Sequence, residues 1–127
     1  MKFLIYALLT ISITACNKYP GEGGSSEISG IVIAQKYNAQ GEIIEEYPLM
    51  DERVYIVYGE ESNISDDNTR TSYDGSFRFA FLKKGKYQIF VYSKCPSCPG
   101  GDEAIIEKFE IDQNKQKRVL PTFYVRQ

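Results

Sequence analysis

The chain has 127 residues, so it offers one domain of ordinary size and no second hydrophobic core once an opening targeting segment is set aside. Its 15 basic and 17 acidic side chains give a net charge of −2 and are interspersed, which argues against a nucleic-acid-binding protein. The sequence has no histidine, and this excludes the usual serine–histidine and cysteine–histidine nucleophiles.

The first residues of the chain have the pattern of an export signal. Lys2 supplies a positive charge, residues 3–13 form a largely apolar stretch, and the small residue Ala15 precedes Cys16. The apolar stretch is shorter than the roughly 20 residues that a transmembrane helix needs. We therefore expect residues 1–15 to be a signal peptide that is removed during export.

Residues 13–16, Ile-Thr-Ala-Cys, resemble the lipobox of bacterial lipoproteins. In that family the cysteine receives a diacylglyceryl group and becomes the mature amino terminus, so the resemblance implies lipidation of Cys16. It also implies a place in the bacterial cell envelope, on the periplasmic or surface face of the outer membrane, with the lipid as the membrane contact. Residues 16–26 are rich in glycine and serine, and we expect them to be a flexible tether.

From Glu27 onward, short runs of alternating apolar and polar residues are separated by glycine, aspartate and asparagine, which predicts one all-β domain over residues 27–127. Ten tyrosines and seven phenylalanines also favour strands. The expected strands are 28–37, 54–58, 69–73, 77–81, 87–91, 104–111 and 119–125, with a short edge extension at 42–47. About seven such strands predict a single antiparallel β-sandwich, with a partly closed barrel as the alternative.

Two turns and one buried face are expected in the middle of the domain. Asp74-Gly75 is the strongest short hairpin signal in the chain. The phenylalanines that follow, Phe77, Phe79 and Phe81, are spaced by two and are expected to share a face in the core. A further turn is expected at Gly85, because glycine tolerates positive φ.

Several of these elements occur in the order found in the carboxypeptidase-regulatory-like, or transthyretin-like, β-sandwich domains of bacterial envelope proteins. The matching residues are Ile28-Ser29-Gly30-Ile31-Val32, Pro48-Leu49 ahead of Val54-Tyr55-Ile56, Thr71 with Asp74-Gly75-Ser76-Phe77-Arg78-Phe79, and Leu82, Gly85, Tyr87, Ile89 and Val91. The resemblance implies a transthyretin-like or immunoglobulin-like topology and a binding, spacer or assembly role. The chain departs from the family in an insertion at 40–47 and in a loop that carries two cysteines. It also lacks the histidines on which transthyretin-like hydrolases rely.

The spacing Cys95-Pro96-Ser97-Cys98 allows a local disulfide, a redox dithiol or half of a thiolate metal site. Pro99-Gly100-Gly101 would break the helix whose amino terminus activates a redox cysteine. A closed zinc site needs four ligands, and the chain has no histidine and no third cysteine free of lipid. We expect Cys95 and Cys98 to form a structural disulfide, with redox or metal chemistry as the alternative.

Two further patterns bear on ligand binding. Asp66-Asp67-Asn68 offers oxygen ligands for calcium, but the EF-hand order is missing, so we expect a polar loop without a metal. Tyr55, Phe90, Tyr92 and Tyr124 fall on the strand phase opposite the core residues. This placement allows an aromatic patch for a glycan or a protein, with ordinary packing under loops as the alternative.

The sequence thus predicts a lipid-anchored envelope domain without catalytic residues, metal or cofactor. It would bind, space or assemble another component, an envelope protein or a glycan, and not a nucleic acid. The alternative is a thiol-redox or metal-handling envelope protein that acts through Cys95 and Cys98.

Overall fold

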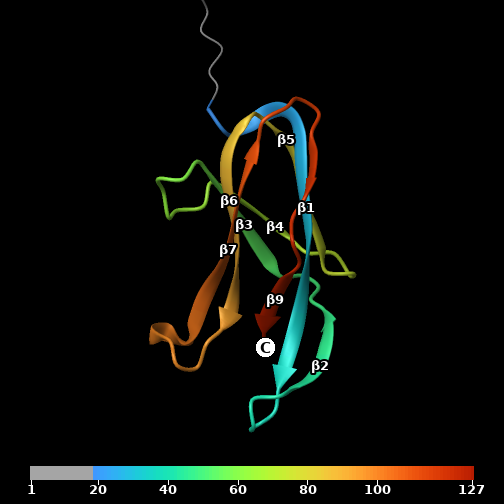
Figure 1. Ribbon diagram of the computed structural model, residues 1–127, viewed down its shortest axis with the longest axis vertical. Helices are drawn as coiled ribbons and strands as arrows, with labels where there is room; N and C mark the ends of the chain where they lie inside the picture. Colours follow the sequence, from blue (N-terminus) through green and yellow to red (C-terminus); the bar gives the residue numbers. More distant parts are fainter. Residues whose placement is uncertain (1–18) are drawn as a thin grey trace, which may run out of the picture.

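The computed structural model describes residues 19–127. The expected signal peptide and the expected lipidation site, Cys16, lie outside these residues, so both stay predictions. Residues 19–127 form two β-sheets that pack face to face (Figure 1). The expected β-sandwich is therefore confirmed. This part of the chain contains no helix of the length and apolarity needed to cross a membrane.

The strands, in chain order, are β1 (Glu22–Tyr37), β2 (Ile43–Pro48), β3 (Arg53–Tyr58), β4 (Asp67–Arg70), β5 (Ser76–Leu82), β6 (Gly85–Lys94), β7 (Asp102–Ile111), β8 (Lys117–Val119) and β9 (Phe123–Arg126). One 3₁₀ turn, η1 (Pro99–Gly101), lies between β6 and β7. The last expected strand, 119–125, is divided into β8 and β9 around Pro121, because proline has no N–H to donate to a neighbouring strand.

Strand β1 is the centre of the first sheet. β2 and β5 lie end to end along one of its edges, where Val32 donates a hydrogen bond to the carbonyl of Gly75 and accepts one from Leu49. β8 and β9 lie along the other edge, and both run parallel to β1. These two pairings correct the expectation of a wholly antiparallel sandwich. A parallel pairing is possible because the chain reaches β8 from β7 in the other sheet and not through a hairpin from β1.

The second sheet has the order β4-β3-β6-β7 and is antiparallel throughout. Its longest hairpin is β6–β7, which is paired from Gly85 opposite Ile111 to Lys94 opposite Asp102. Figure 1 shows this hairpin and the β1–β2 turn projecting at the same end of the molecule, opposite the end where the chain enters β1.

The hydrophobic core lies between the inner faces of the sheets. Its largest fully buried side chains are Tyr87, Phe123, Ile28, Ile56, Ile89 and Ile111. The ring of Phe77 lies so close to β1 that a Cβ on Gly30 would stand 2.5 Å from its Cζ. The glycine of the Ile28–Val32 motif is therefore required by the packing of a core ring on the backbone.

The first strand is longer at its start than expected, because β1 begins at Glu22 and not at Ile28. Glu22 and Ser26 both lie opposite Leu82 of β5, with irregular register between them. A Cβ on Gly24 would stand 2.1 Å from the carbonyl oxygen of Leu82. Gly24, which was expected to belong to the tether, thus allows a close approach of two strands.

Asp74-Gly75 forms the expected tight turn, but it does not close a hairpin. The strands on either side, β4 and β5, belong to different sheets, so this turn carries the chain across the sandwich. The Asp74 carboxylate accepts hydrogen bonds from the backbone N–H and the hydroxyl of Ser76, and these bonds lower the Asp74 pKa. Gly75 has φ of 79°, and a Cβ there would stand 2.5 Å from the carbonyl oxygen of Val32.

Phe77 and Phe79 are buried as expected, but Phe81 is 72% exposed. Phe81 has a positive φ of 58°, and the pairing between β1 and β5 shifts register beside it. Such an irregularity reverses the alternation of side chains, so Leu82 enters the core in place of Phe81. The expectation that all three phenylalanines share the core was wrong at this position.

The turn glycine Gly85 has φ of 148° and packs against Pro20.

Candidate binding face

Three of the four aromatic residues expected outside the core lie together on the outer face of the second sheet. Tyr55 of β3 stacks on Phe90 of β6 with ring centroids 4.9 Å apart. Tyr92 of β6 meets both rings edge-on, at 5.7 Å from Tyr55 and 5.6 Å from Phe90. We call Tyr55, Phe90 and Tyr92 the aromatic face. Tyr124, the fourth residue, lies on β9 in the other sheet.

A shallow hollow of about 210 Å³ adjoins the aromatic face. It is lined by Val57, Ser62, Asn63, Gln88, Phe90, Tyr92, Ala104 and Ile106. The lining from β6 and β7 follows from the register of the hairpin, which sets Phe90 opposite Ile106 and Tyr92 opposite Ala104. None of the lining side chains carries a charge, so the hollow combines apolar walls with a few amide and hydroxyl groups.

The polar rim of the hollow comes from the loop between β3 and β4. Gln88 points to the outer face, yet it is only 8% exposed, and its Nε2 donates to the carbonyl oxygen of Gly59 at 3.1 Å. The far end of the loop is held by Asp66, whose Oδ2 accepts from the backbone N–H of Tyr58 at 2.7 Å. The loop is thus tied to the sheet on both sides of Ser62 and Asn63.

The carboxylates of the Asp66-Asp67-Asn68 segment are engaged in local hydrogen bonds. Besides the bond from Tyr58 to Asp66, the N–H of Asn68 donates to Oδ1 of Asp67 at 2.8 Å. Asp67 and Asn68 also begin strand β4 and do not belong to a loop. Among residues 19–127, the group of acidic and cysteine side chains close enough to share a metal ion is Cys95, Cys98 and Glu103.

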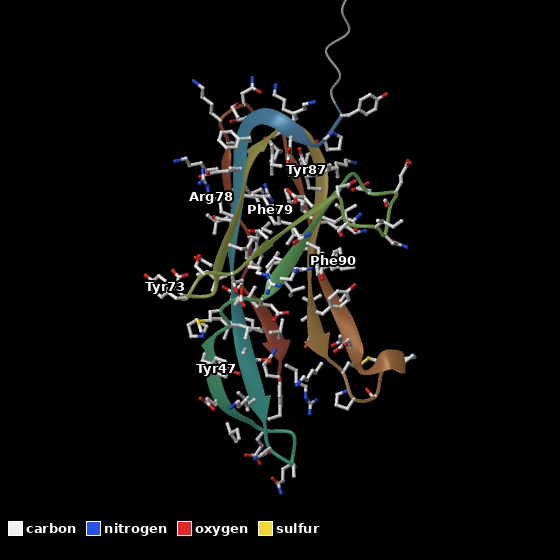
Figure 2. The ribbon with its side chains drawn as sticks, turned by 180° about the vertical axis from the view of Figure 1, so that it is seen from behind. Tyr47, Tyr73, Arg78, Phe79, Tyr87 and Phe90 are labelled. Atoms are coloured by element: carbon white, nitrogen blue, oxygen red, sulfur yellow. A yellow bond between two sulfur atoms is a disulfide. The ribbon has the colours of Figure 1, made fainter. Side chains whose placement is uncertain are left out.

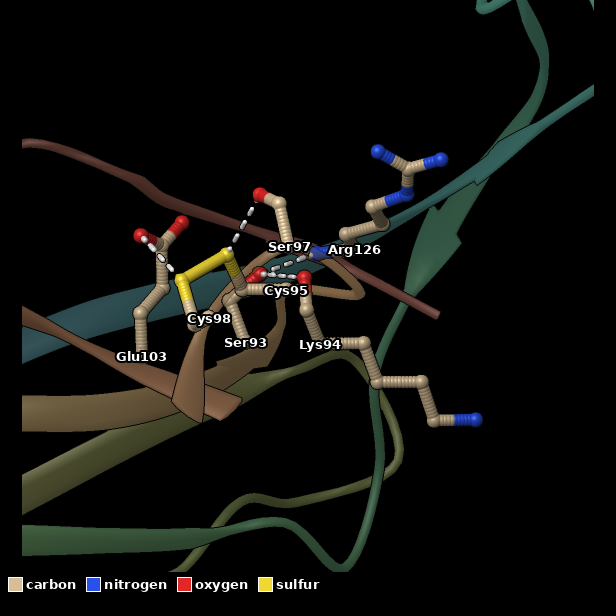
Figure 3. Close-up of a disulfide and its surroundings, with 7 residues drawn as sticks. All are labelled: Ser93, Lys94, Cys95, Ser97, Cys98, Glu103 and Arg126. Carbon is tan, nitrogen blue, oxygen red and sulfur yellow. Dashed lines mark hydrogen bonds between the residues drawn. A yellow bond between two sulfur atoms is a disulfide. The ribbon is translucent and has the colours of Figure 1, made fainter. Parts of the chain in front are cut away.

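Cys95 and Cys98 are joined by a disulfide in the β6–β7 loop, with their Cα atoms 5.3 Å apart (Figure 3). The Glu103 carboxylate lies 3.9 Å from Cys98 Sγ, and the Ser97 hydroxyl lies 3.5 Å from Cys95 Sγ. Each sulfur is bonded to the other, so neither is a thiolate ligand in this state. The loop is also closed by a hydrogen bond from the Cys95 N–H to the carbonyl oxygen of Gly101 at 2.8 Å.

The sequence pattern identified the aromatic residues of this face but not the rest of the hollow. Ser62 and Asn63 belong to a polar loop, and nothing in their local sequence shows which surface the loop covers. Ala104 and Ile106 could have been found, because they share the outward phase of β7 and the hairpin register sets them beside β6. Figure 2 shows Phe90 on the second sheet, below the level of Tyr87 in the core.

No protein-family model matches the chain. No curated protein sequence matches it either. Among solved structures, a proposed carbohydrate-binding protein from Pseudomonas aeruginosa is similar over 84% of this chain and 91% of its own, with 11% identity and a TM-score of 0.49. An (S)-allantoin synthase is similar over 84% of this chain and 42% of its own, with 12% identity and a TM-score of 0.44. The chain therefore spans less than half the length of that enzyme.

Proposed function

We propose that the protein is a lipid-anchored module of the bacterial cell envelope that binds a glycan, without catalysis, through the aromatic face. The observation that carries this proposal is the packing of Tyr55, Phe90 and Tyr92 beside an uncharged hollow on an outer sheet face. A β-sandwich hides its apolar side chains between the sheets. Of the three rings on this outer face, Phe90 is only 9% exposed and Tyr92 is 47% exposed, so the packed cluster presents mainly the Tyr92 ring for contact.

The chemistry of the hollow favours an uncharged ligand that has both an apolar face and hydroxyl groups. Tyr92 is 47% exposed and Ile106 is 50% exposed, so an aromatic ring and an aliphatic side chain are available for contact. Ser62 and Asn63 add hydrogen-bonding groups at the rim. A sugar ring presents C–H groups on one face and hydroxyls at its edge, which matches this combination.

The residues at the start of the sequence support the proposed lipid anchor. The apolar stretch followed by Ile-Thr-Ala-Cys supports lipidation of Cys16, and acyl chains contribute ~0.8 kcal/mol for each buried methylene. Several chains would hold the domain at a membrane of the envelope, so that its binding face meets envelope polysaccharides at high local concentration.

The test is a titration of the full-length lipoprotein in detergent with a panel of soluble neutral oligosaccharides, in which calorimetry measures binding. Tyr92→Ala should weaken binding at least tenfold, because it removes the most exposed ring of the aromatic face. Tyr124→Ala is the matched control, since Tyr124 is 51% exposed but lies on the other sheet. Absence of binding across the panel, or an equal loss in both variants, would contradict the proposal.

A further inference from the structure

We infer that the end of the sandwich nearest the anchor docks on a phospholipid surface with anionic headgroups. This inference rests on the proposed lipid anchor, and it concerns a surface that the binding proposal does not use. The surface, which we call the basic end, is defined by five cationic residues: Lys83, Lys84, Lys115, Lys117 and Arg118.

The fold brings these cations together from the β5–β6 turn and from the β7–β8 loop with the start of β8. The β5–β6 turn lies against the start of β1, because the Lys83 N–H donates to the carbonyl oxygen of Gly21 at 2.8 Å. The β7–β8 loop lies there too, because the Lys115 N–H donates to the Ser25 hydroxyl at 3.0 Å. Figure 1 shows both loops at the end of the molecule where the chain enters β1.

The acidic groups near the basic end do not balance its charge. Glu27 is paired with Arg78, which is outside the set of five, and lies 4.0 Å from the Lys117 ammonium. The adjoining strand ends add Glu22 and Asp112. Lys86 is paired with Glu60 beside this end, and Glu61 lines the same hollow as Tyr19 and Pro20. Five acids thus stand against seven cations, and the side chain of Lys117 is 82% exposed, so its charge is available to a partner.

The opposite end of the molecule has the reverse balance. The β1–β2 turn and the β6–β7 loop, with the strand ends beside them, carry the acids Glu42, Glu45, Glu46, Asp102 and Glu103 and the cations Lys36, Lys94 and Arg126. A surface of negative headgroups would therefore attract one end of the sandwich and repel the other, which orients the domain.

The length of chain before the domain keeps the basic end close to the membrane. The domain begins at Pro20, which packs against Gly85, and at Gly21, whose N–H donates to the Tyr87 hydroxyl at 2.8 Å. Only four residue steps separate Cys16 from Pro20, and they span at most ~14 Å in any conformation. This upper limit is under twice the Debye length of about 8 Å at physiological ionic strength, so shorter conformations bring the basic end within the range of the attraction.

Exposed apolar side chains accompany the cations. Phe81 and Val119 are 72% and 76% exposed and lie beside the two basic loops, and Tyr19 is 73% exposed where the chain enters. Phe81 also has a backbone conformation that bulky residues rarely adopt, and it is this conformation that turns the ring away from the core. Aromatic rings beside lysines are suited to the boundary between headgroups and acyl chains.

The experiment uses the acylated full chain in vesicles and measures amide hydrogen exchange by mass spectrometry. Vesicles of phosphatidylcholine alone are compared with vesicles that contain phosphatidylglycerol. We expect exchange in segments 81–85 and 114–119 to slow at least threefold in the anionic vesicles only, and to recover in high salt. Segments 38–42 and 95–101 at the opposite end should exchange at the same rate in both.

Two charge-reversal variants complete the design. Lys83→Glu, Lys84→Glu, Lys117→Glu and Arg118→Glu together should abolish the slowing, whereas the control Lys36→Glu, Arg53→Glu, Lys94→Glu and Lys108→Glu should keep it. Circular dichroism checks that both variants fold. If either variant does not fold, the salt response of the unmodified chain still tests the inference. Equal exchange in both vesicle types, or slowing at the opposite end, would overturn the inference.

The failure of the anchor would be recognised separately, from the mass of the amino-terminal peptide. If the chain carries no lipid, it is sedimented with the same two vesicle types. Salt-sensitive sedimentation with anionic vesicles alone would then support the docking surface without the anchor. No sedimentation with either type would overturn both.

Discussion

The hydroxyl of Tyr87 accepts a hydrogen bond from the backbone N–H of Gly21 at 2.8 Å, across 66 residues of sequence. The same hydroxyl donates to the carbonyl oxygen of Lys83 at 2.6 Å. The Tyr87 ring is fully buried and stacks on Phe109 with centroids 5.5 Å apart. One core side chain therefore fastens the start of the domain to the β5–β6 turn.

Removing this hydroxyl tests how firmly the start of the domain is held. Tyr87→Phe leaves the N–H of Gly21 without its partner, and an unsatisfied buried donor costs about 1–3 kcal/mol. We expect that loss in chemical denaturation, together with faster amide exchange at Gly21. Tyr124→Phe, which alters an exposed hydroxyl, should change stability by less than about 0.5 kcal/mol. Equal stabilities for the two variants would show that the bond is not formed in solution.

Alkaline pH should destabilise the fold through Tyr58 and Tyr87. Burial, followed by the nearby Glu22, raises the pKa of Tyr58 to about 12, and burial also raises the pKa of Tyr87. An unfolded tyrosine loses its proton near its usual pKa of about 10. Above that pH the unfolded state binds fewer protons than the folded state, so stability is complete below pH 10 and falls as pH rises toward 12. Denaturation at pH 9, 10 and 11 measures the slope, which Tyr58→Phe should reduce.

Phe79 and Phe81 form a matched pair two residues apart on β5. Phe79 is 6% exposed and Phe81 is 72% exposed. Phe79→Ala should lower the free energy of unfolding by about 3–5 kcal/mol, as truncation of a buried aromatic ring does. Phe81→Ala should change it by less than about 0.5 kcal/mol. A large loss for Phe81→Ala would mean that the irregular register of β5 is not present in solution.

The disulfide should contribute little to stability. Closing a loop as short as Cys95–Cys98 removes about 2 kcal/mol or less of unfolded-state entropy, and backbone hydrogen bonds already close the same loop. Cys95→Ser with Cys98→Ser should therefore fold and keep oligosaccharide binding. Alkylation with and without reductant should show the two thiols protected in protein from the envelope. A reduction potential below about −300 mV is expected, whereas one between −200 and −120 mV would favour the redox alternative.

Lipidation of Cys16 is tested by metabolic labelling with a fatty acid. The label should appear on the wild type and be lost in Cys16→Ala, because the proposed anchor is the lipid and not the apolar segment. The variant should accumulate as an uncleaved or soluble product. Undiminished label on Cys16→Ala would show that the acyl group is attached elsewhere and that the lipobox resemblance is misleading.

Local sequence was enough to predict the β-sandwich and the inward residues of its regular strands. Tyr87, Ile89 and Val91 are all fully buried, as their spacing by two predicts, because alternation along a strand is a local property of the backbone. The outward phase of Tyr55, Phe90 and Tyr92 follows from the same rule. The pairing of Cys95 with Cys98 depends on a spacing that is likewise visible in the sequence.

Only the tertiary structure decided where these elements meet. The turn at Asp74-Gly75 has the local chemistry of a hairpin, but β4 and β5 find their partners in different sheets. The alternation that predicts a buried Phe81 is reversed by the irregular pairing of β5 with the start of β1. The glycines before Ile28 look like a tether because sequence composition carries no record of the strand that Gly24 approaches. Strand partners are chosen by long-range packing, so neither the hollow beside Tyr92 nor the basic end is visible until the chain is folded.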